Sequence, residues 1–178
     1  MTAFVALLRA VNVGGGSKLT MADLRATVTG LGHRDVQTYL QSGNAVFTSG
    51  DDNPDRVGPM LEQALAERFG LRTQVLLRTA EELADVVAAN PYLDHQDDFT
   101  KLHVTFLTAA PEPERADVEV PAGETGVLTV RGREVYLHCP DGYGRTKLNN
   151  AFLERRLARP GTTRNWKSVV ALHDLLHA

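Results

Sequence analysis

The order of apolar segments in the first 79 residues constrains the fold more than any other feature of the sequence. Two stretches with apolar residues at helical spacing follow Thr20 and Asn53, both of which are favourable helix N-caps. Strand-length apolar runs alternate with them and lie at 3–11, 36–41, 45–49 and 72–78. The resulting order, βαββαβ, predicts a ferredoxin-like subdomain built on an antiparallel sheet.

The second half of the chain is expected to be a degenerate copy of the first. A third helix begins at a capping box formed by Thr79 and Glu82 and ends before Pro91. Further strands are expected at 101–107 and in a hairpin at 126–139, and further helices at about 149–158 and 166–176. This order is βαββα plus a closing helix, again with an antiparallel sheet.

The chain is therefore predicted to be an α+β protein of two subdomains. We expect a ferredoxin-like subdomain at 1–79, a linking helix and loop at 80–100, and a second α+β subdomain at 101–178. Seven apolar residues are expected to be buried: Leu24, Leu61, Leu65, Leu83, Val104, Val130 and Leu172.

Charge and cysteine content exclude some classes of function. The 178 residues carry a formal net charge of −3, so nucleic-acid binding is not favoured and would need a local basic patch. The apolar run at the N-terminus stops at Arg9, which is too short to span a membrane or to form a signal segment. The single cysteine, Cys139, forms no internal disulfide and fits a reducing compartment. We expect a cytoplasmic protein that does not associate with membranes.

The sequence indicates no cofactor and no metal site. Its six histidines are scattered, and the pair His173 and His177 has no evident third ligand. The oligomeric state is not indicated by any feature of the sequence.

The segment RAVNVGGGSKLT, residues 9–20, is the first candidate binding site. Glycines between a strand and a helix expose backbone N–H groups at the positive end of the helix dipole, which suits an anion. The candidate ligand-binding residues here are Arg9, Asn12, Gly14, Gly15 and Lys18. The segment matches neither the P-loop nor the dinucleotide fingerprint, because serine precedes the lysine and leucine follows it. A flexible connection with a solvated lysine is the alternative interpretation.

The tight turn Ser42-Gly43-Asn44 joins two of the predicted strands. Ser42 and Asn44 are included among the candidate ligand-binding residues.

A second segment repeats the lysine pattern locally. When Lys147 is aligned with Lys18, GRTKLNNAFL lies against GGSKLTMADL, and each segment follows a strand and opens a helix. Thr20 and Asn149 occupy the N-cap position. The match predicts two related helix starts that favour anions, with Arg145 and Lys147 as candidate ligand-binding residues in the second.

The overlapping segment HCPDGYGRT has the His-Cys-x5-Arg-Thr spacing of cysteine-dependent phosphatases. In such an enzyme the Cys139 thiolate would attack phosphorus, while loop amides and Arg145 would hold the phosphate oxygens. Against this hypothesis, Pro140 removes a backbone donor, and Cys139 is in phase with the apolar residues Val135 and Leu137.

The segment TTRNWKS, residues 162–168, contains the only tryptophan of the chain. Arg164, Asn165 and Trp166 are candidate ligand-binding residues, because an indole beside a guanidinium can stack on a base and hold a phosphate. The alternative is that Trp166 is a core anchor at the start of the last helix, and this alternative is favoured for Trp166.

Several segments together resemble one bacterial family. They are LLRAVNVGGGSKLTMADL, YLQSGNAVF, KLHVTFL, GYGRTKLNN and TTRNWKSV. With these segments the chain resembles the domain-of-unknown-function family 1697 over nearly its whole length. The resemblance implies a two-part α+β fold with ferredoxin-like character, and it implies no established activity, substrate or catalytic residue. Ala10 stands where the family typically has glycine, and the family pattern does not require Cys139, which counts against a phosphatase.

The leading functional hypothesis is a binding module for a phosphate-bearing ligand, either a nucleotide or a nucleic-acid segment. The two lysine loops and Arg164 would hold the phosphate. One alternative is a phosphoryl-transfer or phosphate-ester hydrolase that uses Cys139 and Arg145. The other is a protein-interaction or structural role in which both loops only connect neighbouring elements.

Overall fold

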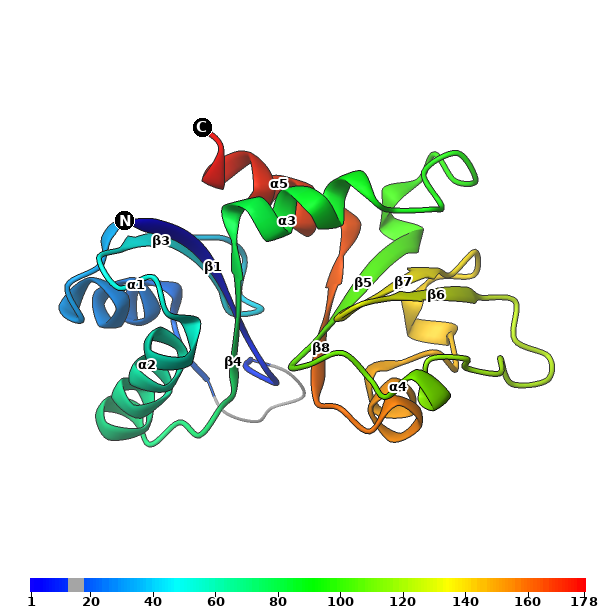
Figure 1. Cartoon of the computed structure of the whole chain (residues 1–178), viewed down its shortest axis with the longest axis horizontal. Coiled ribbons are helices and arrows are strands. Elements are labelled where there is room, and N and C mark those ends of the chain that lie inside the picture. The colour runs from blue at the N-terminus through cyan, green and yellow to red at the C-terminus, as the bar shows by residue number, and fades with distance from the viewer. Residues whose placement is uncertain (13–17) are drawn as a thin grey trace. The chain divides into compact units, whose positions relative to one another are not determined.

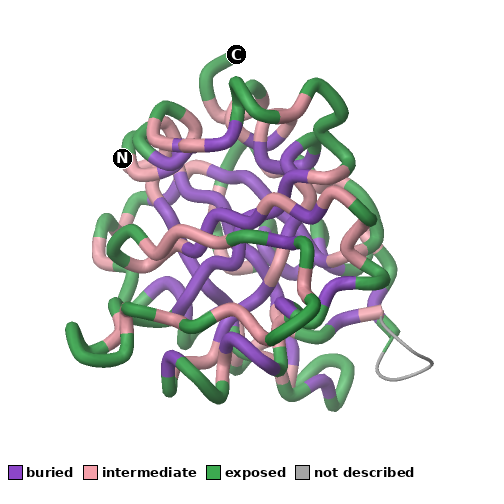
Figure 2. The backbone as a smooth tube through the Cα atoms, turned by 90° about the vertical axis from the view of Figure 1, so that its right-hand side faces the viewer, coloured by how far each residue is buried: buried purple, intermediate pink, exposed green. Residues whose placement is uncertain are grey.

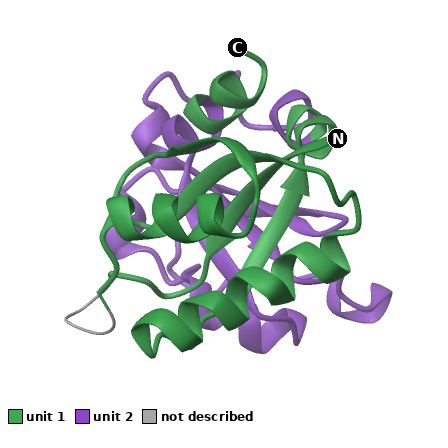
Figure 3. Ribbon diagram, turned by 90° about the vertical axis from the view of Figure 1, so that its left-hand side faces the viewer, with its two compact units in different colours: residues 1–85, 171–178 green, residues 86–170 purple. Residues whose placement is uncertain are grey.

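A computed structural model describes residues 1–12 and 18–178 of the chain (Figure 1). The chain divides into two compact units, coloured separately in Figure 3. Unit 1 consists of Met1–Asp85 and Ala171–Ala178, and unit 2 consists of Val86–Val170. Each unit contains a four-stranded antiparallel sheet, so the predicted α+β fold is confirmed.

Unit 1 has the ferredoxin-like order that the apolar runs predict. Its elements are β1 (Thr2–Leu8), α1 (Met21–Gly30), β2 (Arg34–Thr38), β3 (Asn44–Ser49), α2 (Pro54–Phe69), β4 (Val75–Thr79) and α3 (Ala80–Ala88), which continues into unit 2. The strands lie in the order β2-β3-β1-β4, and every pair is antiparallel. The two sequence-adjacent strands β2 and β3 therefore form a hairpin, while β1 lies at the centre beside β4.

The central strand β1 is buried on both faces, which explains its nearly continuous apolar sequence. Residues 4–8 are all at most 1% exposed. Phe4, Ala6 and Leu8 belong to the core that α1 and α2 cover, whereas Val5 and Leu7 lie on the opposite face. Figure 2 shows buried residues along the inner strands and exposed residues mainly in the connections and on outer helix faces.

The helices of unit 1 begin where their capping residues predict, and α2 also ends at its predicted glycine. The Thr20 hydroxyl accepts a hydrogen bond from the backbone N–H of Asp23 at 3.0 Å. Asn53 caps α2 in the same way, and Gly70 ends that helix with a left-handed φ of 63°. The capping box of α3 is formed in both directions, because Glu82 N–H donates to Thr79 Oγ1 and Thr79 N–H donates to Glu82 Oε2.

Unit 2 repeats this strand order with one helix missing. Its elements are η1 (Phe99–Lys101), β5 (Leu102–Leu107), η2 (Pro113–Arg115), β6 (Val127–Arg131), β7 (Glu134–His138), η3 (Tyr143–Arg145), α4 (Asn150–Leu157), β8 (Gly161–Asn165) and α5 (Trp166–Leu176), which continues into unit 1. The order β6-β7-β5-β8 matches β2-β3-β1-β4 strand for strand. The place of α1 is taken by the long connection that contains the single turn η2, so the second half is a degenerate copy.

Two local predictions are wrong. The apolar pattern predicts no strand at 161–165, yet β8 forms there and pairs with β5 along its length. The run GTTRN lacks apolar alternation, and its pairing is supported by polar contacts such as the one between the Thr105 and Thr163 hydroxyls at 2.7 Å. Val130 was expected to be buried but is only half-buried, because it lies on the edge strand β6. The other six expected core residues are buried.

Within the described residues, none of the helices combines the length and the apolar character needed to cross a bilayer.

Two neighbouring residues of α2 test the assignment of the unit 1 core. Leu61 is 1% exposed, whereas Met60 is 52% exposed. We expect Leu61→Ala to lower the free energy of unfolding by about 2–5 kcal/mol, because it removes buried methyl groups and leaves a cavity. Met60→Ala is the matched control and should change stability by less than about 0.5 kcal/mol. Urea unfolding followed by circular dichroism measures both, and equal losses would contradict the core assignment.

Candidate functional site

A single side chain closes the base of the glycine loop between β1 and α1. Asn12 Oδ1 accepts a hydrogen bond from the backbone N–H of Leu19 at 2.7 Å. Asn12 Nδ2 donates to the backbone carbonyls of Leu19 at 2.8 Å and of Gln41 at 2.6 Å. Asn12 therefore fixes the two ends of the loop to each other and to the β2–β3 hairpin, a role that the sequence analysis did not foresee.

The backbone leading into this loop has an unusual conformation. Ala10 and Asn12 have φ angles of 57° and 58°, in the left-handed region that asparagine tolerates better than most residues. The backbone of Arg9 is bonded to the two residues that precede β4. Its N–H donates to the Gln74 carbonyl, and its carbonyl accepts a hydrogen bond from the Thr73 hydroxyl. The chain thus leaves β1 along a defined path.

Ser42 and Asn44 build the hairpin turn. Asn44 is fully buried, and its Nδ2 donates to the Tyr39 carbonyl at 2.7 Å and to the Ser42 hydroxyl at 2.9 Å. Gly43 has a φ of 85°, and a Cβ at this position would lie 2.9 Å from the Leu8 Cβ. These contacts place the Gln41 carbonyl where Asn12 reaches it, so Ser42 and Asn44 support the loop through the turn.

Lys18 and the cap of α1 complete the described part of this site. Lys18 is exposed, and its side chain makes no hydrogen bond or ion pair with any described residue. Thr20, two residues later, caps α1. Gly14 and Gly15, the remaining candidates of this loop, lie outside the described residues.

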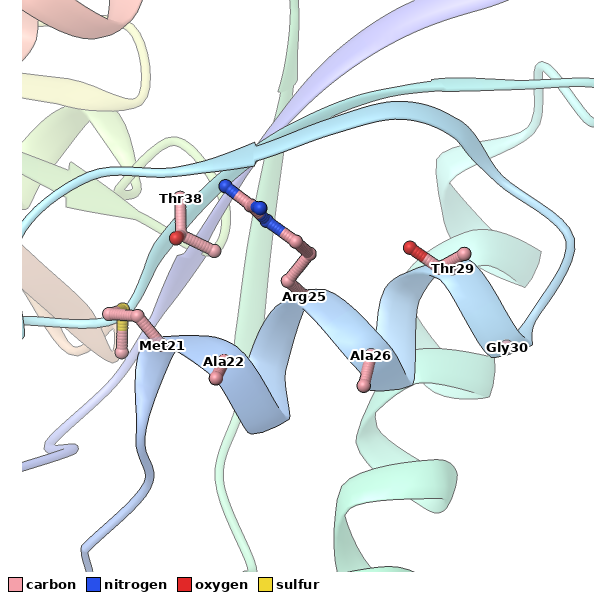
Figure 4. A pocket seen from close by; sticks show the side chains of 7 residues that line it. All are labelled: Met21, Ala22, Arg25, Ala26, Thr29, Gly30 and Thr38. Atoms are coloured by element: carbon pink, nitrogen blue, oxygen red, sulfur yellow. The ribbon is translucent and has the colours of Figure 1, made fainter.

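An open groove runs along the outer side of α1 next to this loop. It has a volume of about 660 Å³ and is lined by Met21, Ala22, Arg25, Ala26, Thr29, Gly30 and Thr38 (Figure 4). The small side chains of Ala22 and Ala26 leave space on the helix, and Arg25 extends from α1 toward the strand that carries Thr38. The groove begins at Met21, the first residue of α1.

The second lysine junction is occupied by a carboxylate of the protein itself. Glu124 Oε2 accepts a hydrogen bond from the backbone N–H of Lys147 at 2.7 Å. Glu124 Oε1 accepts from the N–H of Gly126 at 2.8 Å and from the Thr146 hydroxyl at 3.1 Å. The bond from Lys147 N–H is the main cause that lowers the pKa of Glu124 below its usual value. The Lys147 ammonium donates to the Ala122 carbonyl at 3.2 Å.

The two lysine junctions also occupy different places in the fold. Thr20 and Asn149 are both N-caps as predicted, since Asn149 Oδ1 accepts from the N–H of Phe152. However, α1 follows the central strand β1, whereas α4 follows β7, the counterpart of β3. The counterpart of α4 is therefore α2, and the local sequence match does not reflect the internal repeat.

The cysteine loop does not present an activated thiol. Cys139 is 1% exposed, and burial raises the pKa of its thiol. A pocket of about 100 Å³ lies between residues 123–125 and 139–147. The guanidinium of Arg145 is exposed there and bonds to no other described residue, but the carboxylates of Glu124 and Asp141 line the same pocket and oppose the entry of a phosphate.

The third candidate segment is mostly inside the protein. Arg164 is 5% exposed, and its Nη1 donates to the Thr162 hydroxyl and to the Thr163 carbonyl. Burial lowers the pKa of its guanidinium to about 10. Trp166 is 1% exposed and offers no free ring face, and Asn165 Oδ1 accepts from the N–H of Lys167 at the start of α5. These residues are therefore not placed as a surface binding site.

The internal repeat does relate Arg164 to another residue. Arg78 on β4 lies opposite Val5 of β1, and Arg164 on β8 lies opposite Val104 of β5. Each arginine is buried and is followed by one capping residue, after which α3 or α5 begins. The strand–helix junctions at 78–80 and 164–166 are therefore equivalent positions of the internal repeat. Their sequences share only the arginine.

His103 is a buried histidine that the sequence analysis did not single out. It lies on β5, is 7% exposed and stacks on the ring of Tyr143 with centroids 4.6 Å apart. Its Nδ1 atom is buried and has no hydrogen-bond partner among the described residues. Burial lowers its pKa to about 4, so the ring is neutral near pH 7.

The fold and the loop sequences define a class of two-unit α+β proteins with a repeated ferredoxin-like strand order. Residues 1–136 match the family described as protein of unknown function (DUF1697), and the chain belongs to this family. A solved structure, that of the conserved bacterial protein SP0830 from Streptococcus pneumoniae, is 25% identical, with a TM-score of 0.75 and 98% of each chain covered. None of the curated proteins matches the chain.

The three hydrogen bonds of Asn12, which we call the Asn12 clamp, give a stability prediction. We expect Asn12→Gly to lower the free energy of unfolding by about 2–4 kcal/mol, because three hydrogen bonds are lost while glycine keeps the left-handed backbone free of strain. Asn12→Asp retains the acceptor for Leu19 N–H and loses both donated bonds. Urea unfolding should place it between the parent and Asn12→Gly, and parental stability of Asn12→Gly would contradict the clamp.

The burial of His103 gives a pH prediction. Its folded pKa of about 4 lies below the ordinary 6.5, so the unfolded chain binds its proton first as the pH falls. Stability should therefore decrease between pH 6.5 and about 4, by about 3 kcal/mol from this residue. His103→Phe keeps an aromatic ring on Tyr143 and removes the titration. Urea unfolding above pH 6.5 and near pH 4 should show a smaller acid loss for the variant, and an equal loss would contradict the assignment.

Proposed function

We propose that unit 1 binds the phosphate group of a small ligand, such as a nucleotide, at the loop between β1 and α1. The observation that carries this proposal is the Asn12 clamp, which uses three hydrogen bonds to fix both ends of a glycine-rich loop directly before a capped helix. The bonded residues Asn12 and Leu19 flank the glycines, and fixing these two ends lowers the entropy that a ligand must overcome when it binds between them.

The position of Lys18 supports the same proposal. A cation just before a helix N-terminus opposes the helix dipole. Asp23 lies in the first turn of α1, but the exposed Lys18 ammonium forms no ion pair with it or with any other described residue. A bound phosphate would compensate both the ammonium and the positive end of α1.

The groove along α1 supplies space for the rest of the ligand. It starts at Met21, three residues after Lys18, and its volume of about 660 Å³ is within the range of small-molecule sites. A nucleoside lying there would contact the apolar surface of Met21, Ala22 and Ala26 and the polar groups of Arg25 and Thr38. A small ligand is preferred over a nucleic-acid segment, because the net charge of −3 does not attract a polyanion.

Unit 2 is not expected to carry a second site of this kind. The donors of its lysine junction are bonded to Glu124, and Arg164 is buried. A single phosphate site per chain is therefore proposed, in a protein that we place in the cytoplasm on account of its single reduced cysteine.

The two lysines form a matched pair of variants for a binding test. We expect Lys18→Gln to weaken the binding of ATP, GTP or inorganic pyrophosphate by about tenfold, because a charged hydrogen bond to phosphate is lost. Lys147→Gln should bind like the parent, because the ammonium of Lys147 faces the Ala122 carbonyl. Calorimetry at low and moderate salt measures both, and affinity should fall as salt increases.

Two results would overturn this proposal. The first is a parent protein that binds none of the three probes. The second is a pair of variants whose affinities change equally, which would mean that the glycine loop has no special part in binding. A single-stranded oligonucleotide serves as the fourth probe, and a preference for it would reassign the ligand class.

A further inference from the structure

The outer edge of β6 is a regular strand edge with unused backbone groups. The N–H of Cys139 donates to the Lys101 carbonyl and the N–H of Leu107 donates to the Arg133 carbonyl, so the odd-numbered residues of β7 bond to β5. The even-numbered residues of β7 therefore bond to β6, where they face Val127, Thr129 and Arg131. The N–H and carbonyl groups of Leu128 and Val130 consequently point away from the sheet, and no described residue bonds to them.

The edge of β6 also lacks the features that usually protect an edge strand. The other hairpin edge, β2, has a register shift between Arg34 and Gln37, and Asp35 there has a left-handed φ of 54°. In contrast, β6 pairs with β7 in one unbroken register and contains no proline and no charge before Arg131. Val127, at its start, is 42% exposed. An exposed edge of this kind is a template for another strand.

We propose that β6 is the interface for a second copy of this chain, which adds its own β6 antiparallel about a two-fold axis at Thr129. In this arrangement Leu128 of each copy lies opposite Val130 of the other, and Thr129 lies opposite Thr129. The two outward-pointing residues of each strand then form two hydrogen-bonded pairs, which satisfies all of their free backbone groups. A two-fold axis at any other residue of β6 would leave Leu128 or Val130 without a hydrogen-bonded partner among the five residues of the second strand. The edge of β6 is therefore complementary to itself only about Thr129.

The charge of Arg131 favours the antiparallel orientation. A parallel arrangement would bring Arg131 close to Arg131 of the other copy, and like charges directly opposite are destabilising. In the antiparallel arrangement Arg131 lies opposite the uncharged Val127 instead. The start of β6 carries charges of both signs, because Glu124 and Asp141 lie there beside Arg145 and Lys147.

The expected association is weak. A pair of five-residue strands buries less area than a standard interface, so we expect a dimer that forms between micromolar and millimolar protein concentrations. The proposal is independent of the phosphate site, because β6 belongs to unit 2.

Substitution of Val127 tests the interface without disturbing the fold, because this side chain is 42% exposed. In the dimer Val127 lies opposite Arg131 of the other copy, and this pair occurs twice. Val127→Glu should lower the dissociation constant of the dimer by about tenfold, and Val127→Arg should raise it by about tenfold. Sedimentation velocity over the micromolar to millimolar range measures this, with circular dichroism to confirm folding.

Cysteine cross-linking tests the position of the two-fold axis. In the dimer the Cα atoms of Thr129 and its copy form a non-hydrogen-bonded pair about 4.5 Å apart, so Thr129→Cys should form an intermolecular disulfide on mild oxidation. Val127→Cys is the control and should not, because the two copies of residue 127 lie about 13 Å apart along the strands. The native Cys139 is buried and contributes little background.

Three results would overturn the proposal. The first is a parent protein that sediments as a monomer at every concentration. The second is an equal change of association in Val127→Glu and Val127→Arg. The third is a Val127→Cys variant that cross-links as readily as Thr129→Cys. Each of these would mean that another surface, or no surface, joins two copies.

Discussion

Both sheets depend on a central strand that must be covered on its two faces. Residues 4–8 of β1 are at most 1% exposed, and β5 is buried along its whole length. Because alternate side chains of a strand point to opposite faces, helices on one side alone cannot cover such a strand. In each sheet the edge strand on the other side of the central strand, β4 or β8, carries a buried arginine, Arg78 or Arg164, and continues directly into a helix, α3 or α5.

The part of the fold that depends on local signals could be predicted from the sequence. The cap at Asn53, the αL glycine at 70 and the capping box at Thr79 each act within a few residues, and each is found as expected. The strand β8 could not be predicted in this way, because its polar run GTTRN is held by pairing with β5, more than 50 residues earlier in the chain. The half-burial of Val130 likewise depends on where β6 lies in the sheet, which apolar periodicity does not reveal.

The candidate site was less predictable, because its decisive contacts are also non-local. The sequence marks the glycine loop and both lysines, but the partner of Asn12 at Gln41 and the partner of Lys147 at Glu124 are 29 and 23 residues away. A similarity of ten letters suggested that the two lysine junctions were equivalent. Strand order shows that they are not, since one follows a central strand and the other follows the counterpart of β3. The order of the strands, and not the local sequence similarity, therefore shows which helix starts are equivalent in the two units.

The difference between the two junctions has a physical meaning for the proposed function. An internal carboxylate such as Glu124 satisfies loop donors at a low entropic cost, but it also repels any external anion from the same place. The clamp of the first loop is instead an uncharged amide, which holds the backbone of Leu19 and Gln41 through both its oxygen and its nitrogen. An aspartate at position 12 would lose the two donated bonds and would bring a negative charge to the loop. Asparagine therefore holds Leu19 and Gln41 without placing a carboxylate on this side of the loop. Asp23, in the first turn of α1, offsets part of the helix dipole, but Lys18 forms no ion pair with a described residue, which leaves its ammonium available to an external phosphate.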